Sequence, residues 1–139
     1  QIRQAFRQQM SAVGYQEVNM IGLHACQAAY ETGREWLEEL KVYLRGNLDY
    51  VRDYLEKNLP QIKLIEPEGT YLIWLDCRGL GLTEERLEHL IVHEAKLWLD
   101  AGTIFGAAGE GFERINMACP RAVLGEALKR LRRAVERLA

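Results

Sequence analysis

The sequence predicts an α+β domain in which a small, mostly antiparallel sheet packs against helices, preceded by a long helix. Apolar or small residues recur every three or four positions from Leu23 to Leu59, four short β-prone runs follow, and a second helical stripe covers 121–138. Strands and helices in this order are typical of α+β domains. We therefore divide the chain into a helical segment, 1–59, and a C-terminal α+β domain, 60–139.

Each element follows from a local pattern. Apolar residues at helical spacing predict a short helix over 2–13, which Gly14 ends. The stripe over 23–59 predicts one long helix, with Gly46 as the position for a bend and Pro60 at its end. The later strands are expected at 63–66, 71–76, 97–99 and 112–119, a helix at 84–95 and a glycine-rich loop at 101–111.

Composition excludes several classes of protein. In 139 residues, 48% are hydrophobic and 27% charged, which is typical of a globular domain. A net charge of −2 gives no general attraction to nucleic acid or anionic membranes, and no apolar run approaches the roughly 18 residues of a membrane span. Cys26, Cys77 and Cys119 are far apart and form no CxxC pair. We expect a cytoplasmic protein with no nucleic-acid or membrane partner.

The N-terminus suggests a cut chain. Gln1 opens a helical pattern, with no Met and no apolar signal segment before it. We interpret the chain as part of something longer.

The strand at 112–119 carries the first candidate site residue. Ile115 and Met117 fall on one face of this strand, and Arg114 and Asn116 fall on the other. If helices cover the apolar face, Arg114 lies at solvent, in a cleft or against a partner. An arginine on a rigid strand suits a substrate carboxylate, because its planar fork binds both oxygens. The pattern alone favours a solvated or ion-paired arginine.

Three further patterns favour structural roles. The glycine-rich loop lacks the strand–loop–helix context of a phosphate cradle, so we expect a tight or mobile turn beside a cleft. His89 and His93 have the spacing of two metal ligands but no third ligand, which favours surface histidines over a metal site. The last helix is basic, yet Glu126 and Glu136 interrupt it, which favours a solvated face over a nucleic-acid stripe.

Several motifs resemble those of the cystathionine β-lyase (MalY/PatB-type) branch of class I/II aminotransferases. Residues 67–76, PEGTYLIWLD, and 109–121, GEGFERINMACPR, are similar to two of its specific segments. Phe105-Gly106 falls where the branch has an FG loop. Asn19, Gly22, 28–30, Gly33 and 36–37 resemble its interdomain helix, whereas 100–104, DAGTI, departs from its usual N-P-G loop.

The resemblance implies a fold-type I homodimer of the complete protein, which would bind pyridoxal phosphate and an amino-acid substrate. It implies that Arg114 holds the substrate carboxylate, which reverses the preference from pattern alone, with Phe105, Gly106 and Asn116 at the cleft rim. The Schiff-base lysine of the family lies in an upstream segment, within a large domain that this chain lacks. We therefore expect no catalytic residue, no bound cofactor and no activity in the isolated chain.

Three functions stay open. The complete protein is a pyridoxal-phosphate-dependent C–S β-lyase, or it is an aminotransferase of the same fold. Alternatively, the chain is a non-enzymatic helical interaction module that uses the apolar stripe over 23–59 as its contact surface.

Overall fold

The computed structural model describes residues 1–14 and 18–138. The chain forms two compact units, Gln1–Leu40 and Lys41–Ala139. No helix in the described ranges is both long enough and apolar enough to cross a membrane.

The first unit consists of helices. It contains α1 (Ile2–Ala12), α2 (Met20–Thr32) and the first turns of α3 (Arg34–Asn58). Asn19 caps α2, because its Oδ1 accepts a hydrogen bond of 2.6 Å from the Gly22 amide. Neither α1 nor α2 has a buried residue in the part of the chain that the structure describes. These helices therefore form without a core of their own.

The long helix is interrupted at Gly33, so the prediction of one helix with a bend at Gly46 was wrong. Gly33 separates α2 from α3, and a Cβ atom there would lie 2.4 Å from the carbonyl oxygen of Ala29. At Gly46 the helix continues, and the absent side chain leaves room for Arg121, whose Nη2 would lie 2.6 Å from a Cβ atom. Gly46 therefore permits close packing and does not bend the helix.

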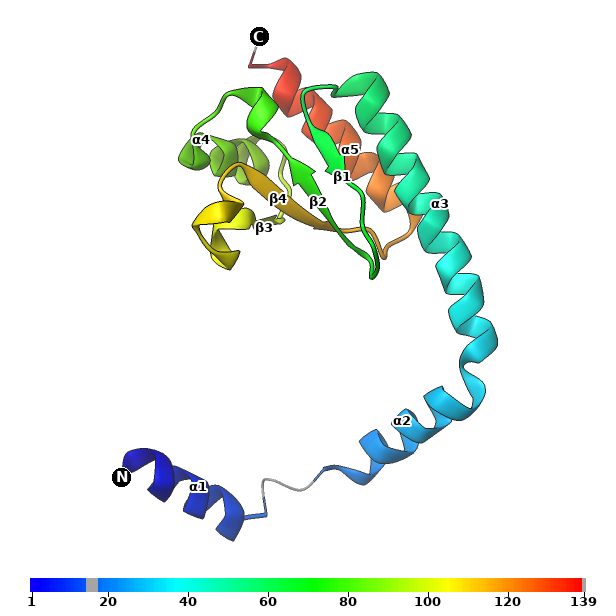
Figure 1. The fold of residues 1–139 in the computed structure, drawn as a ribbon, viewed down its shortest axis with the longest axis vertical. Coiled ribbons are helices and arrows are strands. Elements are labelled where there is room, and N and C mark those ends of the chain that lie inside the picture. The colour runs from blue at the N-terminus through cyan, green and yellow to red at the C-terminus, as the bar shows by residue number, and fades with distance from the viewer. Residues whose placement is uncertain (15–17, 139) are drawn as a thin grey trace. The chain divides into compact units, whose positions relative to one another are not determined.

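The second unit contains a four-stranded sheet (Figure 1). Its strands are β1 (Lys63–Ile65), β2 (Leu72–Asp76), β3 (Asp100–Ala101) and β4 (Phe112–Asn116), in the spatial order β1-β2-β4-β3. All three pairings are antiparallel, which confirms the predicted fold class.

The third strand lies later in the chain than predicted. We expected it at 97–99, and the structure has it at Asp100–Ala101. The preceding helix is also shorter than 84–95: α4 covers Glu84–His89 and continues as a π turn over Leu90–Glu94. The Leu97 amide still bonds to the Ile91 carbonyl, and Lys96 is in the left-handed region with φ 56°. Because these residues close the helix, the chain is not extended until Asp100.

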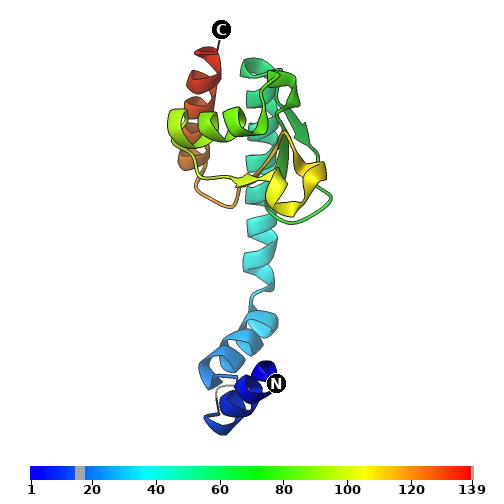
Figure 2. The ribbon, with the colours of Figure 1, turned by 90° about the vertical axis from the view of Figure 1, so that its left-hand side faces the viewer.

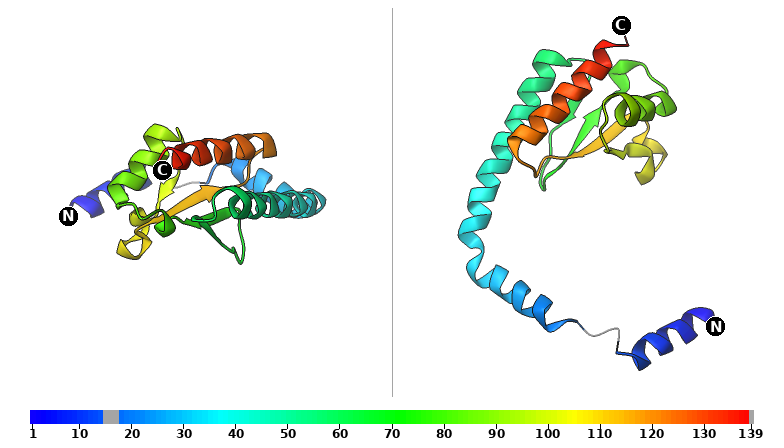
Figure 3. Two further views of the ribbon diagram at one scale, coloured as in Figure 1. Left: turned by 90° about the horizontal axis from the view of Figure 1, so that it is seen from above. Right: turned by 180° about the vertical axis from the view of Figure 1, so that it is seen from behind.

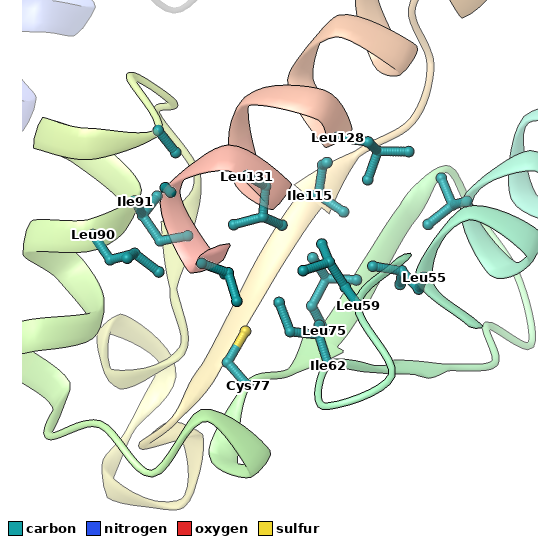
Figure 4. Close-up of a cluster of buried hydrophobic side chains, with 14 of the residues drawn as sticks. Leu55, Leu59, Ile62, Leu75, Cys77, Leu90, Ile91, Ile115, Leu128 and Leu131 are labelled. Carbon is teal, nitrogen blue, oxygen red and sulfur yellow. The ribbon is translucent and has the colours of Figure 1, made fainter. Parts of the chain in front are cut away.

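Helices cover one face of the sheet. In Figures 2 and 3, α4 and α5 (Arg121–Glu136) lie on one side, and the turns over 102–109 lie on the other. Inward side chains of β2 and β4 meet this helical layer, and Figure 4 shows their packing. The core side chains labelled there are Leu55, Leu59, Ile62, Leu75, Cys77, Leu90, Ile91, Ile115, Leu128 and Leu131.

The compact units divide within α3, earlier than the division at 59/60 drawn from the sequence. Val51 and Leu55 of α3, together with Leu59, are at most 2% exposed and belong to the core of the second unit. Most of α3, from Lys41 to Asn58, is therefore built into the α+β unit.

A buried amide fixes α3 to the segment after β4. Asn47 is fully buried, and its Nδ2 donates to the carbonyl oxygens of Met117 (2.8 Å) and Cys119 (3.0 Å). Its Oδ1 accepts a hydrogen bond of 3.0 Å from Arg121 Nε. Removing the amide would take away the side-chain donor of the buried Met117 carbonyl and of the partly buried Cys119 carbonyl.

We expect Asn47→Ala to lower the free energy of unfolding by about 2–4 kcal/mol, because it removes the donor of one buried and one partly buried carbonyl group and leaves a cavity at a fully buried position. Urea titrations of the 139-residue chain measure this change. Asn58→Ala is the matched control, since Asn58 is only partly buried and its bonds reach Tyr54 and Arg132 at the surface. A loss for Asn47→Ala no larger than that of the control would contradict the role of this amide.

Candidate functional site

The pleat of β4 separates two environments. Glu113 and Ile115 are buried on the helix side of the sheet, and Arg114 is partly exposed on the opposite side. We call that opposite side the open face. Arg114 pairs in register with Trp74 of β2 and with Asp100 of β3. These three side chains therefore lie in one row across the open face.

Arg114 is held from two directions. Its Nε and Nη2 donate to a single oxygen, Oδ2 of Asp100, at 3.1 and 2.7 Å. Its guanidinium lies over the ring of Phe105, with Cζ 4.4 Å from the centroid. Phe105 in turn meets Trp74 edge-on, with centroids 5.3 Å apart. An aromatic platform and one carboxylate thus fix the plane of the guanidinium.

A second arginine on the open face, Arg78, pairs with a carboxylate through the same two donors but with both carboxylate oxygens. Arg78 binds both oxygens of Asp76, through Nε to Oδ1 (2.9 Å) and Nη2 to Oδ2 (2.8 Å). This pairing lowers the pKa of Asp76 below its usual range. Arg114 uses only one carboxylate oxygen, and no bond from its Nη1 occurs among residues 1–14 and 18–138. Its Nη1–Nη2 edge can therefore accept a second carboxylate.

The turns that carry Phe105 are built by glycine. These turns, at Gly102–Phe105 and Ala107–Gly109, approach each other so closely that a Cβ atom on Gly102 would lie 2.1 Å from the Gly109 carbonyl oxygen. Glu84 of α4 ties them to the unit: its carboxylate accepts from Thr103 Oγ1 (3.0 Å) and from the Gly111 amide (2.9 Å). The glycine-rich loop is therefore a packed structure beside Arg114.

The predicted rim residues differ in their roles. Phe105 contacts Arg114 directly. Gly106, with φ 124°, ends the first turn in a conformation that favours glycine. Asn116 follows on the open face, but its Oδ1 accepts a bond of 2.8 Å from the Ala118 amide. The structure thus brings Phe105 and Arg114 together and assigns Asn116 a local structural bond.

Comparison with known proteins gives a consistent picture. Cystathionine β-lyase PatB of Bacillus subtilis (strain 168) is 35% identical over 96% of this chain and 34% of its own length. Aspartate aminotransferase of Pyrococcus horikoshii is 35% identical over 58% of the chain and 20% of its own length. Cystalysin from Treponema denticola, solved with pyridoxal 5'-phosphate, has a TM-score of 0.85 and 38% identity, covering 88% of this chain and 31% of that protein. No family model matches the chain.

The chain is homologous to the C-terminal part of pyridoxal-phosphate-dependent cystathionine β-lyases and aminotransferases. It spans about a third of the length of the lyases that it matches. The homology confirms the resemblance drawn from the PEGTYLIWLD and GEGFERINMACPR segments.

The sequence analysis did not single out Glu113 on β4. Its side chain faces the helices, and the residue is only 2% exposed. Burial, together with the nearby carboxylates of Glu84, Glu88 and Asp100, raises the pKa of Glu113 to about 7. The sequence could have predicted this burial, because Glu113 is two residues before Ile115 and so lies on the same face of the strand.

The other candidates lie away from the open face. His89 and His93 have ring centroids 5.0 Å apart, and His89 and Arg86 both contact the carboxylate of Glu94. In the described part of the chain, no group of three or more His, Cys, Asp or Glu side chains could hold a metal ion. On α5, Glu126 and Glu136 pair with arginines four residues away, as on a solvated helix face.

Glu113 predicts a specific pH dependence of stability. Its pKa is raised in the folded chain, so the folded state binds a proton that the unfolded state releases near pH 4.3. The resulting stabilisation is complete below that pH and disappears as the pH rises through about 7. Relative to Glu113→Gln, the parent chain should therefore lose at least about 1 kcal/mol between pH 5 and pH 8.

Urea titrations of both proteins at the two pH values measure this difference. Glu110→Gln, which changes an exposed glutamate three residues away, should follow the parent. Equal pH dependence in the parent and in Glu113→Gln would show that Glu113 titrates normally.

The close approach of the two turns predicts that Gly102→Ala lowers the free energy of unfolding by about 2 kcal/mol or more, since the methyl group would overlap backbone atoms of Gly109 and Phe112. Gly69→Ala is the control, because a Cβ atom at Gly69 meets nothing within 4 Å. Thermal unfolding of the two variants compares them, and similar melting temperatures would mean that the turns adjust without cost.

Proposed function

We propose that this chain supplies the substrate-carboxylate site of a pyridoxal-phosphate-dependent C–S β-lyase, with Arg114 binding the α-carboxylate of an amino acid. The supporting observation is the half-used guanidinium of Arg114: Asp100 holds one edge through a single oxygen, and the other edge is available on the open face. The lyase class is favoured because cystathionine β-lyase PatB matches over 96% of the chain at 35% identity, whereas the two aspartate aminotransferases match over 58% and 81%.

Asp100 and Phe105 are positioning residues in this proposal. Asp100 fixes the rotation of the guanidinium, and Phe105 fixes its plane. A carboxylate that docks on the Nη1–Nη2 edge makes two charge-assisted hydrogen bonds with no reorientation of the arginine. Binding both oxygens fixes the orientation of the amino acid as well as its position.

The residues of this chain do not by themselves fit pyridoxal phosphate. A lysine that forms a Schiff base is activated by desolvation or by a neighbouring cation. All five lysines of the chain are exposed: Lys41, Lys57, Lys63, Lys96 and Lys129. When bound, the cofactor supplies an electron sink for cleavage at Cβ. In the proposal, other parts of the complete protein hold it.

The complete protein is proposed to be a cytoplasmic homodimer. Large apolar side chains of the first unit support a partner surface, because Ile2, Phe6 and Ile21 are each more than 60% exposed. In this proposal, 1–40 packs against the large domain or a second subunit.

An aminotransferase is the second candidate, because two aspartate aminotransferases also match the chain. Product analysis of the complete protein with cystathionine separates the two. Release of pyruvate and a thiol supports the lyase, whereas transfer of the amino group without pyruvate supports the aminotransferase.

In the complete enzyme, we expect Arg114→Ala to lower kcat/KM by at least about 100-fold, which corresponds to about 3 kcal/mol of lost carboxylate binding. In the isolated chain the same change should alter stability by about 1 kcal/mol or less, because the Arg114–Asp100 pair is partly solvated. Steady-state kinetics and urea titration measure the two effects.

Arg78→Ala is the matched control for Arg114→Ala. It removes a second arginine of the open face, one that is 64% exposed and lies outside the row formed by Trp74, Arg114 and Asp100. We expect kcat/KM of this control to stay within about threefold of the parent. If Arg114→Ala behaves like Arg78→Ala, Arg114 does not bind the substrate.

A further inference from the structure

The covered side of β4 borders a pocket that the proposed function does not use. This pocket, which we call the acidic pocket, has a volume of about 570 Å³ and lies between α4, the π turn and β3. Its volume is within the range of small-molecule sites. It belongs entirely to the second unit, and the Arg114 side chain lies on the other face of β4.

The charge of the acidic pocket is uniformly negative. Four carboxylate side chains line it: Glu85, Glu88, Asp100 and Glu113. His89 and His93 also line it, and no lysine or arginine does so among the residues that the structure describes. Asp100 is paired with Arg114, which leaves three carboxylates to act on a ligand.

Glu113 is the feature that points to a ligand. The residue is only 2% exposed, and it lines the pocket. Within 1–14 and 18–138, its carboxyl group makes no hydrogen bond or ion pair, and no fully buried side-chain oxygen lacks a partner, so the Glu113 oxygens reach the solvent of the pocket. A mostly buried carboxylate without a partner is costly, so it is a strong acceptor for any cation that enters. Its raised pKa agrees with this description.

The remaining walls are apolar. Ile91 is buried, Val92 and Leu99 are partly buried, and Trp98 and Ile104 are 89% and 66% exposed at the rim. An exposed indole can contact an alkyl chain or the face of a cation. The pocket thus combines a deep negative charge with an apolar entrance, which suits a cationic head on a short hydrocarbon chain.

We propose that the acidic pocket binds a primary alkylammonium ion, with the ammonium group on Glu113 and the alkyl chain against Trp98 and Ile104. An ammonium group has three hydrogen-bond donors, which can bond to the carboxylate of Glu113 and to that of Glu88 nearby. The pocket shares Asp100 with the Arg114 site, but Glu113 and Arg114 lie on opposite faces of β4, so binding at Glu113 does not depend on the proposed lyase activity.

Binding should depend on pH. The ammonium ion pairs with ionised Glu113, so affinity rises as the pH increases from 6 to 8. The charged and titratable groups that face Glu113 are Glu84, Glu85, Glu88 and His89 on α4, His93 on the π turn, Asp100 on β3 and the buried thiol of Cys77 after β2.

The test is a ¹⁵N chemical-shift titration of the 139-residue chain at pH 8 with pentylamine, which is a cation at this pH as a lysine side chain is. We expect saturable shifts at residues 85–93, 98–104 and 113. Pentanol, a neutral ligand of the same length, should bind at least about 10-fold more weakly, because it lacks the charge-assisted bond. Nα-acetyl-lysine amide distinguishes the two possible sources of the ammonium group. Tighter binding than that of pentylamine indicates a lysine side chain of a protein, and weaker binding indicates a free amine.

Two variants locate the charge. Glu113→Gln should weaken pentylamine binding at least about 10-fold, while Glu110→Gln, outside the pocket, should leave it unchanged. Glu88→Gln, at an exposed position, tests the same site if Glu113→Gln does not fold, and should weaken binding about threefold. Shifts that do not saturate, equal binding of pentanol, or unchanged affinity in these two pocket variants would overturn the proposal.

Discussion

The pleat of β4 is the constraint on which both sites depend. Successive side chains of a strand point to opposite faces, so Arg114 and its neighbour Glu113 are placed in different environments by backbone geometry alone. One carries its charge beside solvent and stacks on Phe105, and the other is buried beneath the helices. A shift of one residue in the register with β2 would exchange them and bury the guanidinium.

That register is secured mainly by the helical layer. Ile73, Leu75 and Ile115 fill the inner face of the sheet, and Asn47 binds the backbone just beyond β4. The glycine-rich turns are secured separately, by contact between Gly102 and Gly109 and by Glu84. The surroundings of Arg114 therefore rest on rigid elements on both sides, as a substrate-orienting group requires.

The two arginines of the open face show how similar residues acquire different uses. Arg78 and Asp76 are two positions apart and satisfy each other through both oxygens. Arg114 meets a single oxygen of a carboxylate from a different strand, and its side chain is 25% exposed, against 64% for Arg78. The difference comes from strand pairing, and neither local sequence predicts it.

The sequence by itself determined the fold class, the order of the elements and the side of β4 on which Arg114 lies, because these follow from periodicities of 3.6 and 2 that each segment carries alone. It also identified the family through two motifs. Tertiary structure decided the break at Gly33, the late start of β3, the pairing of Asp100 with Arg114 and the burial of Glu113. These four features depend on contacts between segments distant in the chain or on backbone packing at single residues. Local sequence patterns encode neither kind of contact.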